Sequence, residues 1–168
     1  AALNSYGSIP IDLDWNDLEM DDPDHFTDVG AVEFAERFVR TVMPHLRGYK
    51  QLYVLTDSTI DYNDRTVEGE WHGRASKYVE SLFSKHDINA SVDAVCGSGF
   101  VAGASDGQHF RNRLLNHLSH SLPSAILFMG GWNDVHRPRV HVLNAIYNCV
   151  SIARSGRKRR ALPVQYDP

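Results

Sequence analysis

Short apolar runs alternate with longer amphipathic segments along most of the chain. The runs are rich in β-branched and aromatic residues and are bounded by polar residues or glycine, a pattern that predicts β-strands. The longer segments repeat apolar residues every three to four positions, which predicts helices. Strands are expected at 50–56, 90–96 and 124–131, with an apolar stretch at 8–13 and a further candidate strand at 161–166; helices are expected at 28–46, 71–86, 107–122 and 139–154.

This alternation predicts an α/β fold. Strands separated by helices of ten to twenty residues form a parallel sheet with helices on both faces. A chain of 168 residues can bury one core, so we expect a single domain over 1–168. Ligands of parallel sheets bind outside the carboxyl ends of the strands. A functional site is therefore expected just after Thr56, Cys96 and Met129.

Charge and hydropathy narrow the range of partners. The formal net charge is −4, so nothing predicts binding to nucleic acid or to an anionic membrane. No apolar run approaches the roughly 18 residues of a membrane span. The segment "AALNSYGSIP" has no signal-peptide pattern and no Met. The localisation stays open, as does whether the chain is part of a longer protein or assembly.

Two smaller features have simple interpretations. Cys96 and Cys149 are too few for a disulfide framework or a cysteine-based zinc site, so we expect buried free thiols. The run "RSGRKRR" at 154–160 predicts a solvated basic linker or tail. A dibasic processing site and a small anionic contact are the alternatives for this run.

The three predicted strand ends carry groups that suit acyl chemistry. Ser58 follows the first strand, "CGSGF" follows the second, and Asn133 in "GGWND" follows the third. A hydroxyl, glycines that let backbone N–H groups approach a ligand, and a side-chain amide are the components of a serine nucleophile with an oxyanion hole. Singly, the serine and the glycines are more typical of ordinary turns. Their convergence at one sheet edge favours the functional interpretation.

A carboxylate and a histidine precede the first long helix. In "DDPDH", Asp22 lies three residues before His25. A carboxylate held beside an imidazole makes a general base. Asp21 and Asp24 are the neighbouring alternatives to Asp22 as the orienting acid.

Together these segments resemble the blocks of the SGNH hydrolases, also called the GDSL esterases and lipases. "TDST" is similar to the family's serine block, "CGSGF" to its glycine block, "GGWND" to its G-x-N-D block and "DPDH" to its D-x-x-H block. The resemblance covers roughly residues 10–150. It implies a three-layer α/β/α sandwich with a mainly parallel, flavodoxin-like sheet, and no cofactor or metal.

The resemblance also implies an activity and the residues that perform it. The activity is hydrolysis of small acyl or O-acetyl esters by a catalytic triad of Ser58, His25 and Asp22. Ser58 is the nucleophile, His25 the base, and Asp22 orients the base. A non-catalytic carbohydrate-binding or structural domain with this fold, and an acyltransferase with the same triad, are the alternatives.

By the same resemblance, three groups form the oxyanion hole. They are the Ser58 N–H, the Gly97 N–H and the Asn133 side chain, with Gly99 as the alternative to Gly97. Asp134 is expected to hold its own loop and to take no part in the chemistry.

The order of the blocks departs from the family's. The D-x-x-H block comes last in the family and first here, which looks like a circular permutation. "RGYK" (47–50) would then join the family's last helix to its first strand. Such a connection has an ordinary length, and a triad is defined by geometry and not by chain order. Thr56 stands where the family usually has Gly. The alternative to permutation is a swapped assembly, in which a second chain supplies His25.

A pair of histidines has the spacing of a metal site. His117 and His120 lie three apart on a predicted helix. That helix offers no acidic partner, so we expect both side chains to face solvent.

Overall fold

The computed structural model describes residues 18, 20–22, 25–58, 60, 66–67, 70–71, 75–103 and 106–161. For residues 20–22, 25, 26, 28, 66, 67, 70, 71 and 156–161 it describes the backbone only. The expected apolar stretch at 8–13 and, apart from Ala161, the candidate strand at 161–166 lie outside these residues.

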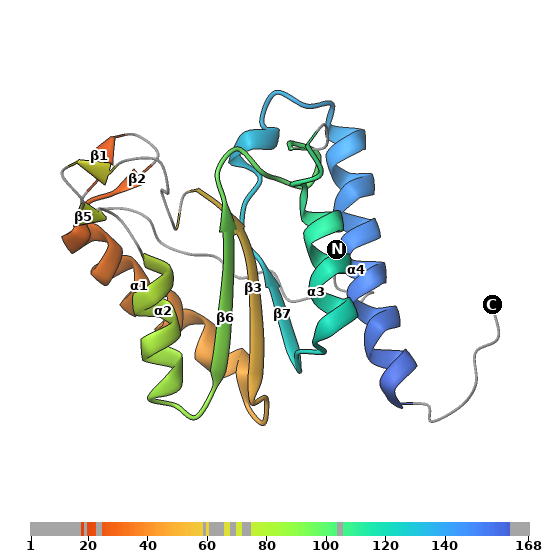
Figure 1. Ribbon diagram of the computed structural model, residues 1–168, viewed down its shortest axis with the longest axis horizontal. Coiled ribbons are helices and arrows are strands. Elements are labelled where there is room, and N and C mark those ends of the chain that lie inside the picture. The colour runs from red at the N-terminus through yellow and green to blue at the C-terminus, as the bar shows by residue number, and fades with distance from the viewer. Residues whose placement is uncertain are drawn as a thin grey trace.

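A parallel three-stranded sheet forms the middle of the molecule, with helices on both faces (Figure 1). Its strands are β3 (Gln51–Asp57), β6 (Asn89–Val95) and β7 (Ala125–Phe128). The first face is covered by α1 (Asp28–Val42) and α2 (Ala75–Ser84), and the second by α3 (Phe110–His120) and α4 (Arg139–Ala161). The predicted α/β fold with a parallel sheet is confirmed.

The strand order β6-β3-β7 creates a topological switch point. The chain leaves β3 through α2 to reach β6 on one side, and then passes through α3 to reach β7 on the other side. In open parallel sheets the crevice for a ligand lies at the carboxyl ends of the strands where such a reversal occurs. Figure 1 shows all three strands ending at the upper edge of the sheet, which we call the carboxyl edge.

Strand β3 shows why helices cover both faces of the sheet. Leu52 and Val54 belong to the core under α1 and α2, whereas Tyr53 and Leu55 belong to the core under α3 and α4. All four side chains are at most 2% exposed. A strand buried on both faces reads as a continuous apolar run, as "LYVL" does.

Helix α1 leads into β3 as the sequence predicted. The Thr27 side chain caps α1 by accepting a hydrogen bond from the Gly30 N–H at 3.1 Å. The short 3₁₀ helix η2 (Met43–Leu46) follows α1, and the Tyr49 N–H donates to the Leu46 carbonyl at 3.0 Å before β3 begins. The helix expected over 28–46 and its short link to the next strand are therefore confirmed.

Two segments differ from the prediction. Helix α2 begins at Ala75 and not at 71, because Glu70–Trp71 form the strand β5, which pairs with β4 (Thr66–Val67). Residues 154–160, expected as a linker or tail, continue α4 to Ala161. Arg, Lys and Ala have high helix propensity, so a single glycine in this run does not end the helix.

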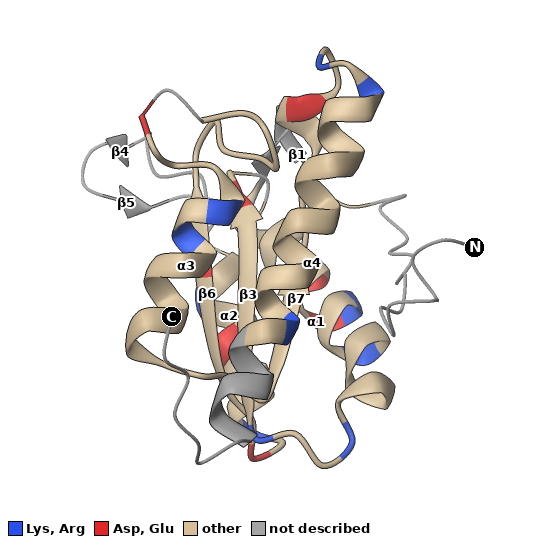
Figure 2. Ribbon diagram, turned by 90° about the vertical axis from the view of Figure 1, so that its right-hand side faces the viewer, with Lys and Arg blue, Asp and Glu red and all other residues tan. Residues whose placement is uncertain are grey.

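Charge and hydropathy agree with the sequence analysis. Among the described residues, no helix is both long and apolar enough to cross a membrane. Figure 2 shows both acidic and basic residues along the described ribbon.

Candidate functional site

Ser58 lies in the turn that follows β3. Asp57 before it and Ile60 after it are fully buried. The Ile60 carbonyl accepts a hydrogen bond from the Ala75 N–H at 3.1 Å, which ties this turn to the start of α2. Ser58 itself is half-buried, and its Oγ has no hydrogen-bond partner among the described residues. The turn is thus fixed on both sides of a hydroxyl that remains accessible.

The loop after β6 is folded around the carboxylate of Asp134. This side chain is 3% exposed and accepts hydrogen bonds from the Phe100 N–H at 2.7 Å, the Val101 N–H at 3.1 Å and the Ala102 N–H at 2.8 Å. Charge-assisted bonds of this kind are about twice as strong as neutral ones. Asp134 belongs to the 3₁₀ helix η3 (Trp132–Asp134), so it joins the loops that follow β6 and β7. Asp134 was expected to hold its own loop, and the structure corrects this, because its carboxylate holds the loop that follows β6.

The two candidate glycines of the oxyanion hole are in different situations. A Cβ at Gly99 would lie 2.6 Å from Asp134 Oδ2, and the Gly99 N–H already donates to the Ala102 carbonyl at 3.2 Å. Gly97 is exposed, has a φ of +68°, and its N–H has no acceptor among the described residues. Of the two, Gly97 is the residue whose N–H is available to a ligand.

Asn133 lies against the same loop. Its Nδ2 donates a hydrogen bond to the Ser98 carbonyl at 2.9 Å. The amide has two N–H donors, and the second has no acceptor among the described residues. The Met129 N–H donates to the Leu55 carbonyl at 3.0 Å, which brings the chain leading to Asn133 beside the end of β3. The structure therefore brings Asn133 and the Gly97 loop together at the carboxyl edge.

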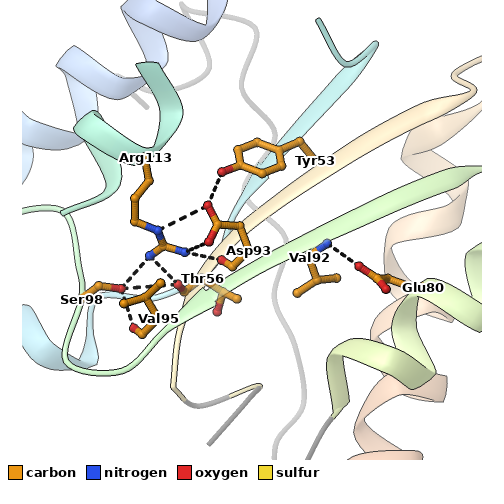
Figure 3. A network of polar contacts seen from close by, with 8 residues as sticks. All are labelled: Tyr53, Thr56, Glu80, Val92, Asp93, Val95, Ser98 and Arg113. Carbon is orange, nitrogen blue, oxygen red and sulfur yellow. Dashed lines mark hydrogen bonds and ion pairs between the residues drawn. The ribbon is translucent and has the colours of Figure 1, made fainter. Parts of the chain in front are cut away.

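A buried arginine, missed in the sequence analysis, lies beneath this edge (Figure 3). Arg113 on α3 is 7% exposed, and its Nη1 donates to the Thr56 carbonyl at 3.0 Å and to Ser98 Oγ at 2.8 Å. Its Nη2 forms an ion pair of 2.6 Å with Asp93 Oδ1. The available signal was the helical spacing of Phe110, Arg113 and Leu114, which places Arg113 on the buried face of α3.

Tyr53 and His117 complete the far side of this network. The Tyr53 hydroxyl donates to Asp93 Oδ2, and burial together with this carboxylate raises the pKa of Tyr53 far above its usual range. The His117 ring stacks on Tyr53 with 3.6 Å between centroids and 7° between planes. The prediction that His117 faces solvent is therefore wrong, because it covers an aromatic ring. Burial lowers the pKa of His117. His120 is exposed, as expected.

His25 and Asp22 are placed by their backbone. They are cross-strand partners in the antiparallel pair of β1 (Met20–Asp22) and β2 (His25–Phe26). This pair directly precedes α1 and lies, in Figure 1, toward the end of the molecule where β3 and β6 end. The side chains of both residues, and Asp24 as a whole, lie outside what the structure describes.

The described residues include both cysteines of the chain. These residues include no group of three or more metal-ligating side chains. Cys149 is buried as expected, and burial raises the pKa of its thiol to about 12. Cys96 is exposed, which corrects the expectation of two buried thiols, because it opens the turn after β6.

Comparison with family models, curated proteins and solved structures found no match for the chain. Functional reasoning about this chain therefore depends on the residues gathered at the carboxyl edge.

Proposed function

We propose that this protein is a serine ester hydrolase of the SGNH type that acts on small acyl or O-acetyl esters. The observation that carries the proposal is the bond between Asn133 Nδ2 and the Ser98 carbonyl at 2.9 Å. It supports a site in which the side-chain amide of Asn133 and the available N–H of Gly97, the residue before Ser98, act together at the edge where β3 ends. These donors and the hydroxyl of Ser58 are what an acyl-transfer site requires.

In the proposed mechanism, Ser58 Oγ attacks the ester carbonyl while His25 takes the hydroxyl proton. The oxyanion that forms is stabilised by the Ser58 and Gly97 N–H groups and by the second N–H of Asn133. His25 then gives the proton to the leaving alcohol, and Asp22 stabilises the imidazolium in between. Water, activated by His25, releases the acid from Ser58.

The course of α1 supports a site formed within one chain. The β1–β2 pair that carries Asp22 and His25 precedes α1, and α1 leads back to the start of β3. Strand β3 then runs on to Ser58 at the carboxyl edge, so the proposed base and nucleophile lie at the two ends of this path. This arrangement is what a circular permutation of the family's block order requires.

The nucleophile is tested with a fluorophosphonate probe and a panel of nitrophenyl esters and acetylated sugars. The probe is expected to label Ser58, and Ser58→Ala is expected to remove both labelling and hydrolysis while the melting temperature is retained. Ser119→Ala, at an exposed serine in α3, is the matched control and should keep both. Labelling of Ser58→Ala at the wild-type rate would show that the assignment is wrong.

The chain that supplies His25 is tested by mixing two inactive variants, Ser58→Ala and His25→Ala. A site formed within each chain stays inactive in the mixture. Recovery of activity would show that a second chain supplies the histidine. Product analysis with added alcohol acceptors separates hydrolysis from acyl transfer, and sugar binding without probe labelling would favour the non-catalytic alternative.

A further inference from the structure

The guanidinium group of Arg113 is fully hydrogen-bonded. An arginine side chain has five N–H donors in a rigid planar fork. Nη1 donates to the Thr56 carbonyl and to Ser98 Oγ, Nη2 donates to the carbonyl and to Oδ1 of Asp93, and Nε donates to Asp93 Oδ2 at 3.4 Å. A buried polar group whose donors are all used favours one arrangement of its partners.

The partners of Nη1 lie at the end of β3 and in the loop after β6, the two segments that carry the proposed site. Thr56 is two residues before Ser58, and its carbonyl is held at 3.0 Å. Ser98 follows Gly97, and its own carbonyl accepts the bond from Asn133. The Ser98 hydroxyl also donates to the Val95 carbonyl at 2.7 Å, which fixes it to the end of β6. A continuous set of bonds therefore runs from the end of β3 through Arg113 and Ser98 to Asn133.

We propose that Arg113 is a positioning residue, and that Ser98 transmits its effect to the oxyanion hole. Arg113 sets the distance between the β3 end, which carries the nucleophile, and the β6 loop, which carries the Gly97 N–H and fixes Asn133. This inference rests on the proposed hydrolase function. The side chain acts through other residues, because Asp93 balances its charge and α3 places it below the edge.

The planar fork of arginine is essential to this role. Lysine keeps the positive charge but offers three donors from a single nitrogen, so it cannot bridge Thr56, Ser98 and Asp93 at once. Ser98 offers a gentler change, because Ser98→Ala removes the hydroxyl while keeping the backbone carbonyl that Asn133 contacts. Ser119→Ala is the matched control, since it also removes a serine hydroxyl, from an exposed position of α3 outside the Arg113 network.

The decisive experiment measures kcat, KM and the amide hydrogen exchange of residues 96–103 in these variants. Ser98→Ala is expected to lower kcat about 10- to 100-fold, because small displacements of reacting groups have effects of this size, with KM within about twofold. It should also speed amide exchange in the loop. Arg113→Lys should show the same pattern more strongly, whereas Ser119→Ala should keep the wild-type kcat and loop exchange. Thermal unfolding confirms that each variant is folded.

The outcomes separate the two proposals. If Ser98→Ala matches wild type in both kcat and loop exchange, Arg113 does not position the site, although the hydrolase function stands. If the wild type shows neither probe labelling nor ester hydrolysis, the hydrolase function fails, and the exchange data alone decide the role of Arg113. Loop exchange in Ser98→Ala that equals the exchange in Ser119→Ala and in wild type would then overturn the positioning role.

Discussion

The two faces of the sheet are buried by different means. Under α1 and α2 the described core is apolar, with Phe38 packed against Phe83 at 6.1 Å between ring centroids. Under α3 and α4 the core also includes apolar residues such as Phe110, but the ion pair of Arg113 and Asp93 lies beside it. One alternating strand, β3, contributes to both.

The two faces therefore contribute differently: the apolar face mainly to stability, and the face with the ion pair to the positioning of residues. Apolar burial is non-directional and supplies most of the folding free energy. A buried ion pair contributes little net stability, because desolvation of the charges offsets their attraction, but it constrains where its partners lie. The face under α1 and α2 should therefore tolerate small shifts of its residues, whereas the Arg113 face should transmit such shifts to the carboxyl edge.

The largest expected effect comes from truncating a buried side chain in the apolar core under α1 and α2. Phe38→Ala should lower the free energy of unfolding by about 3–5 kcal/mol, because the side chain is fully buried and leaves a cavity. Urea unfolding measures this loss, and kcat per folded molecule should stay at the wild-type value. Val29→Ala, on the same helix and 56% exposed, is the control. A large fall in kcat per folded molecule would show that the two faces are not separable in function.

The complementary change removes a side chain at the carboxyl edge and leaves the apolar core intact. Asn133→Ala should lower kcat about 10²–10³-fold, which is typical for the loss of one oxyanion donor, while KM changes little. Its stability cost should be only about 1 kcal/mol, from the lost bond to Ser98. Asn144→Ala, at an exposed position of α4, serves as the control in steady-state kinetics. An unchanged kcat would remove Asn133 from the oxyanion hole.

The two glycines in the loop after β6 allow two effects on stability to be compared within a single turn. Gly99→Ala should destabilise the protein by about 1–3 kcal/mol, the range for overpacking, because its Cβ meets the Asp134 carboxylate. Gly97→Ala has open space but needs a positive φ, which costs about 1 kcal/mol for an L-residue. Thermal unfolding of the two variants shows which of them is less stable. If Gly97→Ala is the more destabilised, the close packing of Asp134 under Gly99 is not the tighter constraint.

The sequence predicted the fold and the strand ends well, because both follow from short-range patterns. The buried run of β3 and the helical periodicity of α1 are local signals, and parallel strands necessarily bring their carboxyl ends to one edge. The helical course of 154–160 was not predicted. A basic run is typical of a solvated linker or tail, but the residues of this run also favour helix.

The Arg113 network could not be predicted, because it depends on contacts between distant elements. Asp93 and Arg113 are separated by twenty residues, and the helical spacing that puts Arg113 on the buried face of α3 does not indicate which residues it contacts there. The stacking of His117 on Tyr53 was missed for the same reason, since a helical position does not reveal which strand residue it covers. Packing between distant segments determines these partners, and the periodicity of the sequence does not reveal them.

The smallest expected effect is a pH dependence that arises on the polar face. Burial lowers the pKa of His117, with Asp93 opposing the shift and His120 adding to it, so the folded state favours the neutral ring. Because the folded pKa lies below the unfolded value of about 6.5, this stabilisation is present above that pH and is lost as the pH falls through the folded pKa. His117→Phe keeps a ring that can stack on Tyr53 but does not titrate, so its melting temperature should fall less than that of wild type between pH of about 7.5 and 5. The exposed His86, in the turn after α2, supplies the control variant His86→Gln. Parallel pH profiles for His117→Phe and wild type would show that the stacked ring is not coupled to folding.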